Sequence, residues 1–177
     1  MGRFEKTLSR VLRGTADANI AFSDLCALLR HLGFDERVRG GHHIFTREGV
    51  AEILNLQPRG NQAKPYQVKQ VRGVIVTNGL ADDAEEWASE TTDEYQTEGQ
   101  RRRSDMPDRV QYEIVLYWSK EDQAFIAEVP ELPGCAADGA TYQDALANVE
   151  VVIREWIETA RELGRPIPQP RGRLMYA

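Results

Sequence analysis

Hydrophobic residues in the first 80 positions recur with helical spacing in three separate stretches. Apolar side chains three or four positions apart predict amphipathic helices. The stretches cover residues 4–12, 25–32 and 68–75. Gly14 and Gly33 are expected to end the first two helices. Ser23 is the expected N-cap of the second helix, and Pro65 is the expected first residue of the third.

Runs rich in β-forming residues lie between the second and third predicted helices. His42–Thr46 and Ala51–Leu56 predict two strands joined by a turn, and Glu36–Arg39 predicts an additional strand before them. The predicted order of this first part is α-α-β-β-β-α.

The alternation of apolar and polar residues resumes after residue 110. It predicts a strand through Tyr112, Ile114, Leu116 and Trp118. Ala124–Val129 predicts the second strand of a hairpin, and Cys135–Asp138 predicts a short third strand. Thr141 is the expected N-cap of a long helix that ends near Gly164. The order β-β-β-α gives the chain a second α+β module.

Charge divides the chain in the same way as hydrophobicity. Residues 1–80 hold 12 Lys and Arg against 7 Asp and Glu, a net charge of +5. Residues 81–109 hold 4 against 10 (−6), and residues 110–177 hold 6 against 11 (−5). We therefore expect a basic module at 1–80, an acidic and polar linker at 81–109, and an acidic module at 110–177.

Composition excludes several classes of protein. No apolar run approaches the ~20 residues that span a bilayer, and the first residues form no signal-peptide core, so a cytoplasmic chain without membrane contact is expected. Only two cysteines occur, Cys26 and Cys135, which excludes a disulfide scaffold and a cysteine-rich zinc site.

The run Gly40-Gly41-His42-His43 is the most suggestive candidate for chemistry. Adjacent side chains of a strand face opposite ways, so one histidine at most joins a given site. Imidazole carries protons near neutral pH, and glycines allow a phosphate backbone to approach closely. Nearby cations could hold phosphates; they include Arg39, Lys64, Lys69 and Arg72. The spacing alone fits an ordinary strand histidine on a basic face better than a catalytic one.

Metal and cofactor sites are not predicted. No cysteine or carboxylate lies at ligand spacing from His42 or His43 in the sequence. No glycine-rich dinucleotide fingerprint is present either.

Two known families resemble the two modules. Gly40–Phe45, the following strand Ala51–Gln57, and Lys64-Pro65 opening a helix resemble the HicA toxins, small ribonucleases with a double-stranded-RNA-binding-domain-like (dsRBD-like) fold. The second module resembles the HicB antitoxins, which have a partial RNase-H-like fold. The residues that carry this second resemblance are Tyr112–Leu116, Phe125–Cys135, Asp138–Thr141 and Asp144–Asn148.

The resemblance implies a toxin and its antitoxin on one polypeptide. His42 matches the catalytic histidine, Gly41 replaces the usual serine, and Lys64 matches the basic residue that opens the last helix. The expected reaction is metal-independent cleavage of mRNA by attack of a ribose 2′-hydroxyl, with His42 as acid or base. Arg39, Lys64 and Lys69 would stabilise the developing charge.

The resemblance also implies partners. The acidic module is expected to cover the RNA face, within one chain or exchanged across a homodimer or higher homo-oligomer. No DNA-binding domain follows Gly164, so operator DNA is not an expected partner. Met106, after Arg101-Arg102-Arg103, is a candidate internal start for separate antitoxin synthesis.

Two other interpretations stay open. The chain could be a non-catalytic RNA-binding protein with a dimerising second module, because double-stranded RNA is read mostly by shape and backbone. It could also be an inactivated relic in which the first module only stabilises its partner.

Overall fold

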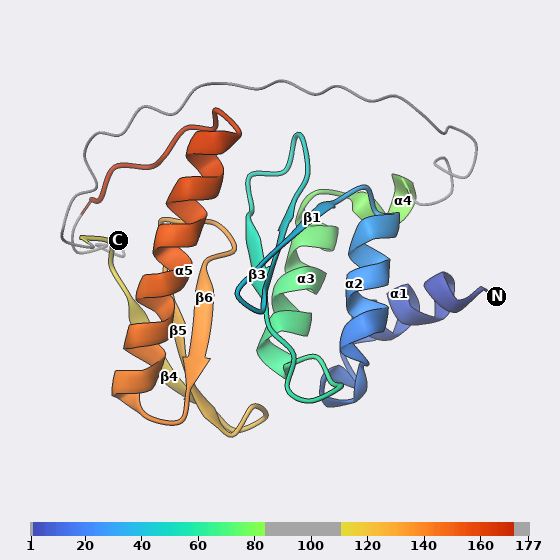
Figure 1. The fold of residues 1–177 in the computed structure, drawn as a ribbon. Coiled ribbons are helices and arrows are strands. Elements are labelled where there is room, and N and C mark those ends of the chain that lie inside the picture. Colours follow the sequence, from blue (N-terminus) through green and yellow to red (C-terminus); the bar gives the residue numbers. More distant parts are fainter. Residues whose placement is uncertain (1, 84–110, 172–177) are drawn as a thin grey trace, which may run out of the picture.

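A computed structural model describes residues 2–83 and 111–171, which form two modules of mixed helix and sheet (Figure 1). The first module contains α1 (Arg3–Arg13), α2 (Phe22–His31), β1 (Asp35–Arg39), β2 (His42–Thr46), β3 (Leu54–Leu56), α3 (Pro65–Thr77) and α4 (Leu80–Asp83), with a 3₁₀ turn at Asp17–Asn19. The second contains β4 (Val115–Ser119), β5 (Ala124–Glu128), β6 (Ala136–Gly139) and α5 (Tyr142–Glu162). The predicted linker, from residue 84 onward, and Met106 lie outside the described residues.

The three long helices of the first module occur where hydrophobic spacing predicted them, with one shifted start. Helix α2 begins at Phe22, two residues before the start expected from Ser23 as N-cap. The Phe22 amide donates to Asn61 O at 3.0 Å, and Ala63 N donates to Ile20 O at 2.8 Å. Backbone pairing with residues 61–63 therefore positions the start of the helix, without a side-chain cap.

Strand β3 is shorter than the predicted run Ala51–Leu56 because Ile53 turns toward the second module. The Ile53 amide donates to Pro133 O at 3.1 Å, and the same oxygen accepts Trp156 Nε1 at 2.9 Å. Pro133 thus joins the first module to α5 through one carbonyl group.

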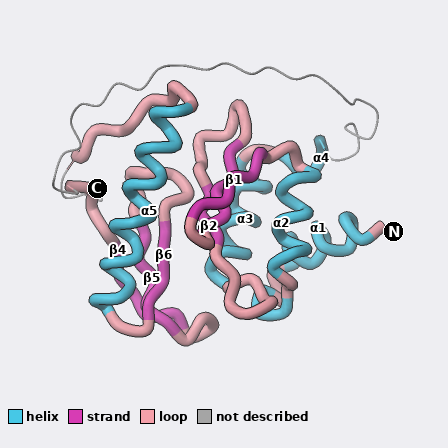
Figure 2. Tube along the Cα trace, viewed as in Figure 1, coloured by secondary structure: helices cyan, strands magenta, loops and turns pink. Residues whose placement is uncertain are grey.

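The first sheet has the order β1-β2-β3 and is antiparallel throughout. One face carries Phe45, Leu54 and Leu56, which pack with the helices in a core lying wholly within residues 4–81. The other face turns toward the second module, so the sheet lies between α5 and the helices of the first module (Figure 2). This core gives the first module hydrophobic contacts of its own.

The second sheet has the order β4-β5-β6, also antiparallel, and α5 packs on it. Its core includes Val149, Ile153 and Trp156 of α5. Ile44 and Ile53 of the first module are buried in this same core, at 3% and 1% exposure. The two modules therefore share a hydrophobic interface.

Gly134 lies where the backbones of the two modules approach each other closely. Its φ of +82° is a left-handed conformation, and a Cβ there would lie 2.7 Å from the carbonyl oxygen of Ile53. Only glycine fits this contact without a shift of the backbone.

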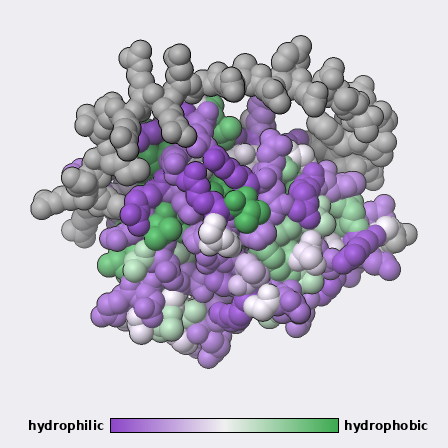
Figure 3. Space-filling model, viewed as in Figure 1, coloured by the Kyte–Doolittle hydropathy of each residue, from purple (hydrophilic) through white to green (hydrophobic). Residues whose placement is uncertain are grey.

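The visible surface is mostly hydrophilic over both modules, with small separate hydrophobic areas (Figure 3). Among residues 2–83 and 111–171, no helix has the length and apolar character needed to cross a membrane.

Thr141 caps α5 as the sequence predicted, and its Oγ1 accepts the Asp144 amide at 3.1 Å. We expect Thr141→Ala to lower the free energy of unfolding by about 1 kcal/mol, because it leaves that amide without its side-chain partner. Urea denaturation of the intact chain measures the change. Thr141→Ser keeps the hydroxyl and should stay near wild type; equal losses in both variants would contradict a capping role.

Candidate active site

The two histidines of β2 face opposite sides of the sheet, as their spacing predicted. Gly40 and Gly41 form the two-residue turn between β1 and β2, with φ values of 55° and 85°. Two consecutive residues with positive φ are typical of a type I′ hairpin turn, which favours glycine at both positions. The turn pairs Arg39 with His42 across the strands, so their side chains lie on one face.

His42 lies at the interface between the modules with 16% of its side chain exposed. Its Nδ1 is 3.0 Å from Asn55 Oδ1 and 2.8 Å from Glu155 Oε2. Asn55 Nδ2 also donates to Glu155 Oε2, at 2.5 Å. Because both oxygens facing Nδ1 are acceptors, the contacts favour a proton on this nitrogen.

Carboxylates of α5 contact the cations on the same sheet face. Arg39 pairs with Glu158 and Arg37 pairs with Glu162. Glu155, Glu158 and Glu162 are three and four residues apart, a spacing that places them on one face of the helix. The hydrogen bond to Glu158 and the charge of that carboxylate raise the pKa of Arg39.

A second group of contacts lies at the start of α3. Lys64 Nζ is 2.7 Å from Asp138 Oδ1, and both side chains are largely buried. The Tyr66 hydroxyl donates to the same oxygen at 3.1 Å, and burial together with the Asp138 charge raises the pKa of Tyr66. The Tyr66 amide donates to Asp122 Oδ1 at 3.0 Å, which satisfies a free N–H of the first turn of α3.

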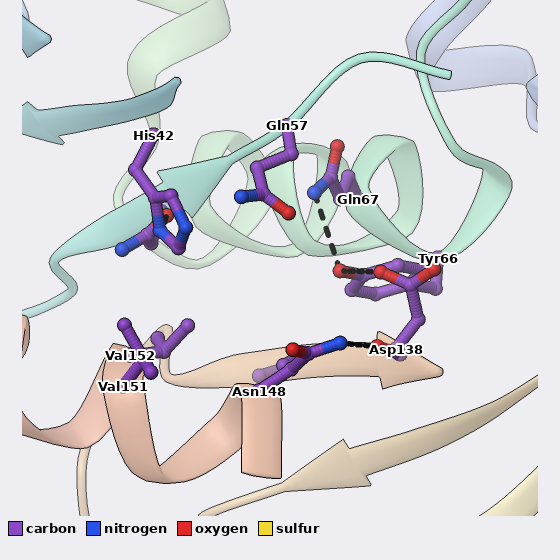
Figure 4. A pocket seen from close by; sticks show the side chains of 11 residues that line it. His42, Gln57, Tyr66, Gln67, Asp138, Asn148, Val151 and Val152 are labelled. Carbon is purple, nitrogen blue, oxygen red and sulfur yellow. Dashed lines mark hydrogen bonds between the residues drawn. The ribbon is translucent and has the colours of Figure 1, made fainter. Parts of the chain in front are cut away.

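These contacts enclose a small polar cavity of about 50 Å³ between the modules. His42, Gln57, Gln67 and Tyr66 face it from the first module, and Asp138 and Asn148 face it from the second (Figure 4). A cavity of this size admits water and is far too small for a nucleotide. Residues of the second module therefore cover most of the His42 side chain, of which 16% is exposed.

The structure brings three of the predicted site residues together: Arg39, His42 and Lys64 all contact carboxylates of the second module. Lys69 lies further out and pairs with Glu121 at 2.7 Å, with both side chains about half exposed. Gly40 and Gly41 lie in open space, since a Cβ on either would meet nothing within 4 Å.

Arg72 is separate from this group and serves the first module. Its Nε donates to Val11 O at 2.6 Å, and its guanidinium pairs with the buried Asp17. These contacts hold the end of α1 against α3 instead of leaving a cation free for phosphate.

The sequence predicted an acidic module covering this face, but it did not single out Asn55, Tyr66, Glu155 or Asp138 as the contacts. Asn55 and Tyr66 carried no recognisable spacing signal, because they approach His42 only after β3 and α3 pack. The i, i+3, i+7 spacing of Glu155, Glu158 and Glu162 was a detectable signal of an acidic helix face.

Comparison with known proteins covers the second module. The family model of the HicB-like antitoxin of bacterial toxin–antitoxin systems matches residues 112–174. A UPF0150 protein of Thermoplasma acidophilum is 36% identical over 55 residues, 31% of this chain and 80% of that protein. A UPF0150 protein of a Synechocystis species is 39% identical over 57 residues, 32% of this chain and 77% of that protein. No solved structure matches the chain significantly.

Proposed function

This chain belongs to the HicB-like antitoxin family of bacterial toxin–antitoxin systems, and from that premise we propose that it carries its own toxin. The first module is a HicA-like, metal-independent endoribonuclease with a dsRBD-like fold that cleaves mRNA. Residues 111–171 hold it inactive. The observation that supports this most directly is the contact of Arg39, His42 and Lys64 with carboxylates of the second module.

His42 is the proposed catalytic residue. Asn55 holds Nδ1–H, which leaves Nε2 free to take the proton from a ribose 2′-hydroxyl as it attacks the adjacent phosphate. As the 2′-oxygen bonds to phosphorus the P–O5′ bond breaks, which leaves a 2′,3′-cyclic phosphate, and the departing 5′-oxygen takes a proton from water. Arg39 and Lys64 stabilise the negative charge that develops on the reacting phosphate. Lys69 binds another phosphate further along the RNA. None of these steps requires a metal ion.

Inhibition follows from the carboxylates that occupy the phosphate positions. Glu155 fills the position beside His42, Glu158 the position beside Arg39, and Asp138 the position beside Lys64. A carboxylate and a phosphate oxygen make the same charge-assisted hydrogen bonds to these cations, so RNA and the second module compete for one surface. Because the two are on one chain, docking is intramolecular and has an effective concentration on the order of mM.

The same contacts are compatible with exchange of second modules across a homodimer, which we include in the proposal. A partner copy could supply Glu155 and Asp138 in the same positions. Sedimentation of the intact chain distinguishes the monomer from this arrangement.

The test is release of the first module. A protease site placed within residues 84–110 allows the folded chain to be cut and its halves separated, which the separate core of the first module supports. With a chelator present, we expect the intact chain to leave RNA uncut and the separated first half to cleave it. Returning the second half should stop cleavage.

Three other outcomes of this release experiment would contradict the proposal. RNA binding without cleavage by a folded first half would favour the non-catalytic RNA-binding protein. Neither binding nor cleavage would favour an inactivated relic. Full cleavage by the intact chain would contradict inhibition by the second module.

A further inference from the structure

Three potential metal ligands meet on the helix-covered side of the first sheet. Cys26 comes from α2, Glu36 from β1 and His43 from β2, and their ligand atoms all lie within 4.8 Å of one another. His43 Nδ1 is 2.7 Å from Glu36 Oε1. This group carries no spacing signal along the chain, because Glu36 and His43 become neighbours only through the β1–β2 pairing.

The donor set suits zinc and related transition metals. A thiolate, an imidazole and a carboxylate are the usual protein ligands of Zn²⁺, and three of them leave a fourth position open. Bonds of about 2.0–2.3 Å place neighbouring ligands of a tetrahedral ion roughly 3.3–3.8 Å apart. In the structure the three ligand atoms lie within 4.8 Å of one another. Small rotations of the Cys26 and Glu36 side chains bring them to the spacing that a tetrahedral ion requires.

Charge and surroundings also fit a bound dication. Burial and the Glu36 charge raise the pKa of the Cys26 thiol to about 12, so the ion displaces the thiol proton when it binds. The resulting thiolate and the Glu36 carboxylate then balance the two charges of Zn²⁺. The second oxygen of Glu36 pairs with Arg30, which fixes the carboxylate with Oε1 directed at His43 Nδ1, and a bound ion takes the place of that 2.7 Å contact. The Phe22 ring packs edge-on against His43 with centroids 5.0 Å apart and limits rotation of the imidazole. Outer contacts of this kind orient metal ligands in proteins.

We propose that Cys26, Glu36 and His43 bind a Zn²⁺-class ion that ties α2 to the β1–β2 hairpin. The site lies on the opposite face of the sheet from His42, so it is separate from the proposed nuclease chemistry. The ion is structural in this arrangement, because it links two elements of the first module and has no contact with the interface cavity.

The test is a Co²⁺ titration of the untagged, reduced intact chain. Thiolate ligation to Co²⁺ produces a sulfur-to-metal charge-transfer absorption band, and we expect one equivalent of Co²⁺ to saturate it. Zn²⁺ should displace the Co²⁺. Cys26→Ser should abolish the band, and Glu36→Gln should weaken binding by at least about 10-fold.

Cys135 provides a matched control because it is the only other cysteine and is equally buried, in the second core. All three histidines of the chain lie in the first module, so Cys135→Ser should leave the titration unchanged. Circular dichroism verifies that the variants are folded. Absence of the band in the wild type, its persistence in Cys26→Ser, or its loss in Cys135→Ser would each overturn the proposal.

Discussion

Substitution of His42 by alanine should lower RNA cleavage by the separated first half by about 10²–10⁴-fold, the usual contribution of one general acid or base. Alanine removes the Nε2 base, whereas Arg39 and Lys64 continue to bind phosphate. RNA affinity should therefore change little while the rate falls. A fluorescent oligonucleotide measures both, by anisotropy for binding and by gel for cleavage.

His43 is the matched control for this experiment. It is adjacent in sequence but faces Phe22 and Glu36 on the other side of the sheet. In the presence of a chelator, folded His43→Gln should cleave RNA at close to the unsubstituted rate. Equal losses at both positions would indicate a fold defect, and unchanged cleavage in His42→Ala would remove His42 from the mechanism.

Substitution of Glu155 by lysine in the intact chain should activate RNA cleavage by at least about 30-fold. Glu155 accepts hydrogen bonds from both His42 and Asn55, and its side chain is only 12% exposed. Loss of one partner of a buried, hydrogen-bonded charge pair costs about 2–5 kcal/mol, and every 1.4 kcal/mol is tenfold in the docking equilibrium. A lysine in this position also repels Arg39.

Glu150→Lys makes the same charge change on the same helix at an exposed position outside this interface. This substitution leaves the contacts of Glu155 with the first module unchanged, so the intact Glu150→Lys chain should remain inactive. Comparable activation by both substitutions would mean that net charge, and not the contact with His42, controls inhibition. Activation of Glu155→Lys alone would assign that contact its inhibitory role.

Local signals in the sequence predicted most of the fold. Hydrophobic spacing placed α1, α3 and α5 to within a residue or two, and Thr141 fixed the start of α5 through its side chain. The errors occur where tertiary contacts override local preference. Ile53 left the predicted strand because its amide bonds to Pro133 in the other module.

The candidate site was only partly predictable for the same reason. Alternation along β2 correctly separated His42 from His43, and basic character singled out Lys64. Neither pattern predicts that Asn55 and Glu155 lie beside His42. Asn55 belongs to β3 and Glu155 to α5, and they approach His42 only in the folded chain. Arg72 was grouped with the phosphate ligands by charge alone, although its contacts lie within the first module.

The position of the covering helix near the end of the described chain has a consequence for translation. Glu155 is made 72 residues after Asp83, an interval of roughly 4–14 s at about 5–20 residues per second. Under the proposed function, each nascent chain presents the His42 face before its cover exists. The length of that interval depends on ribosome speed and not on docking affinity, so slow translation prolongs the exposure even when the finished protein is fully closed.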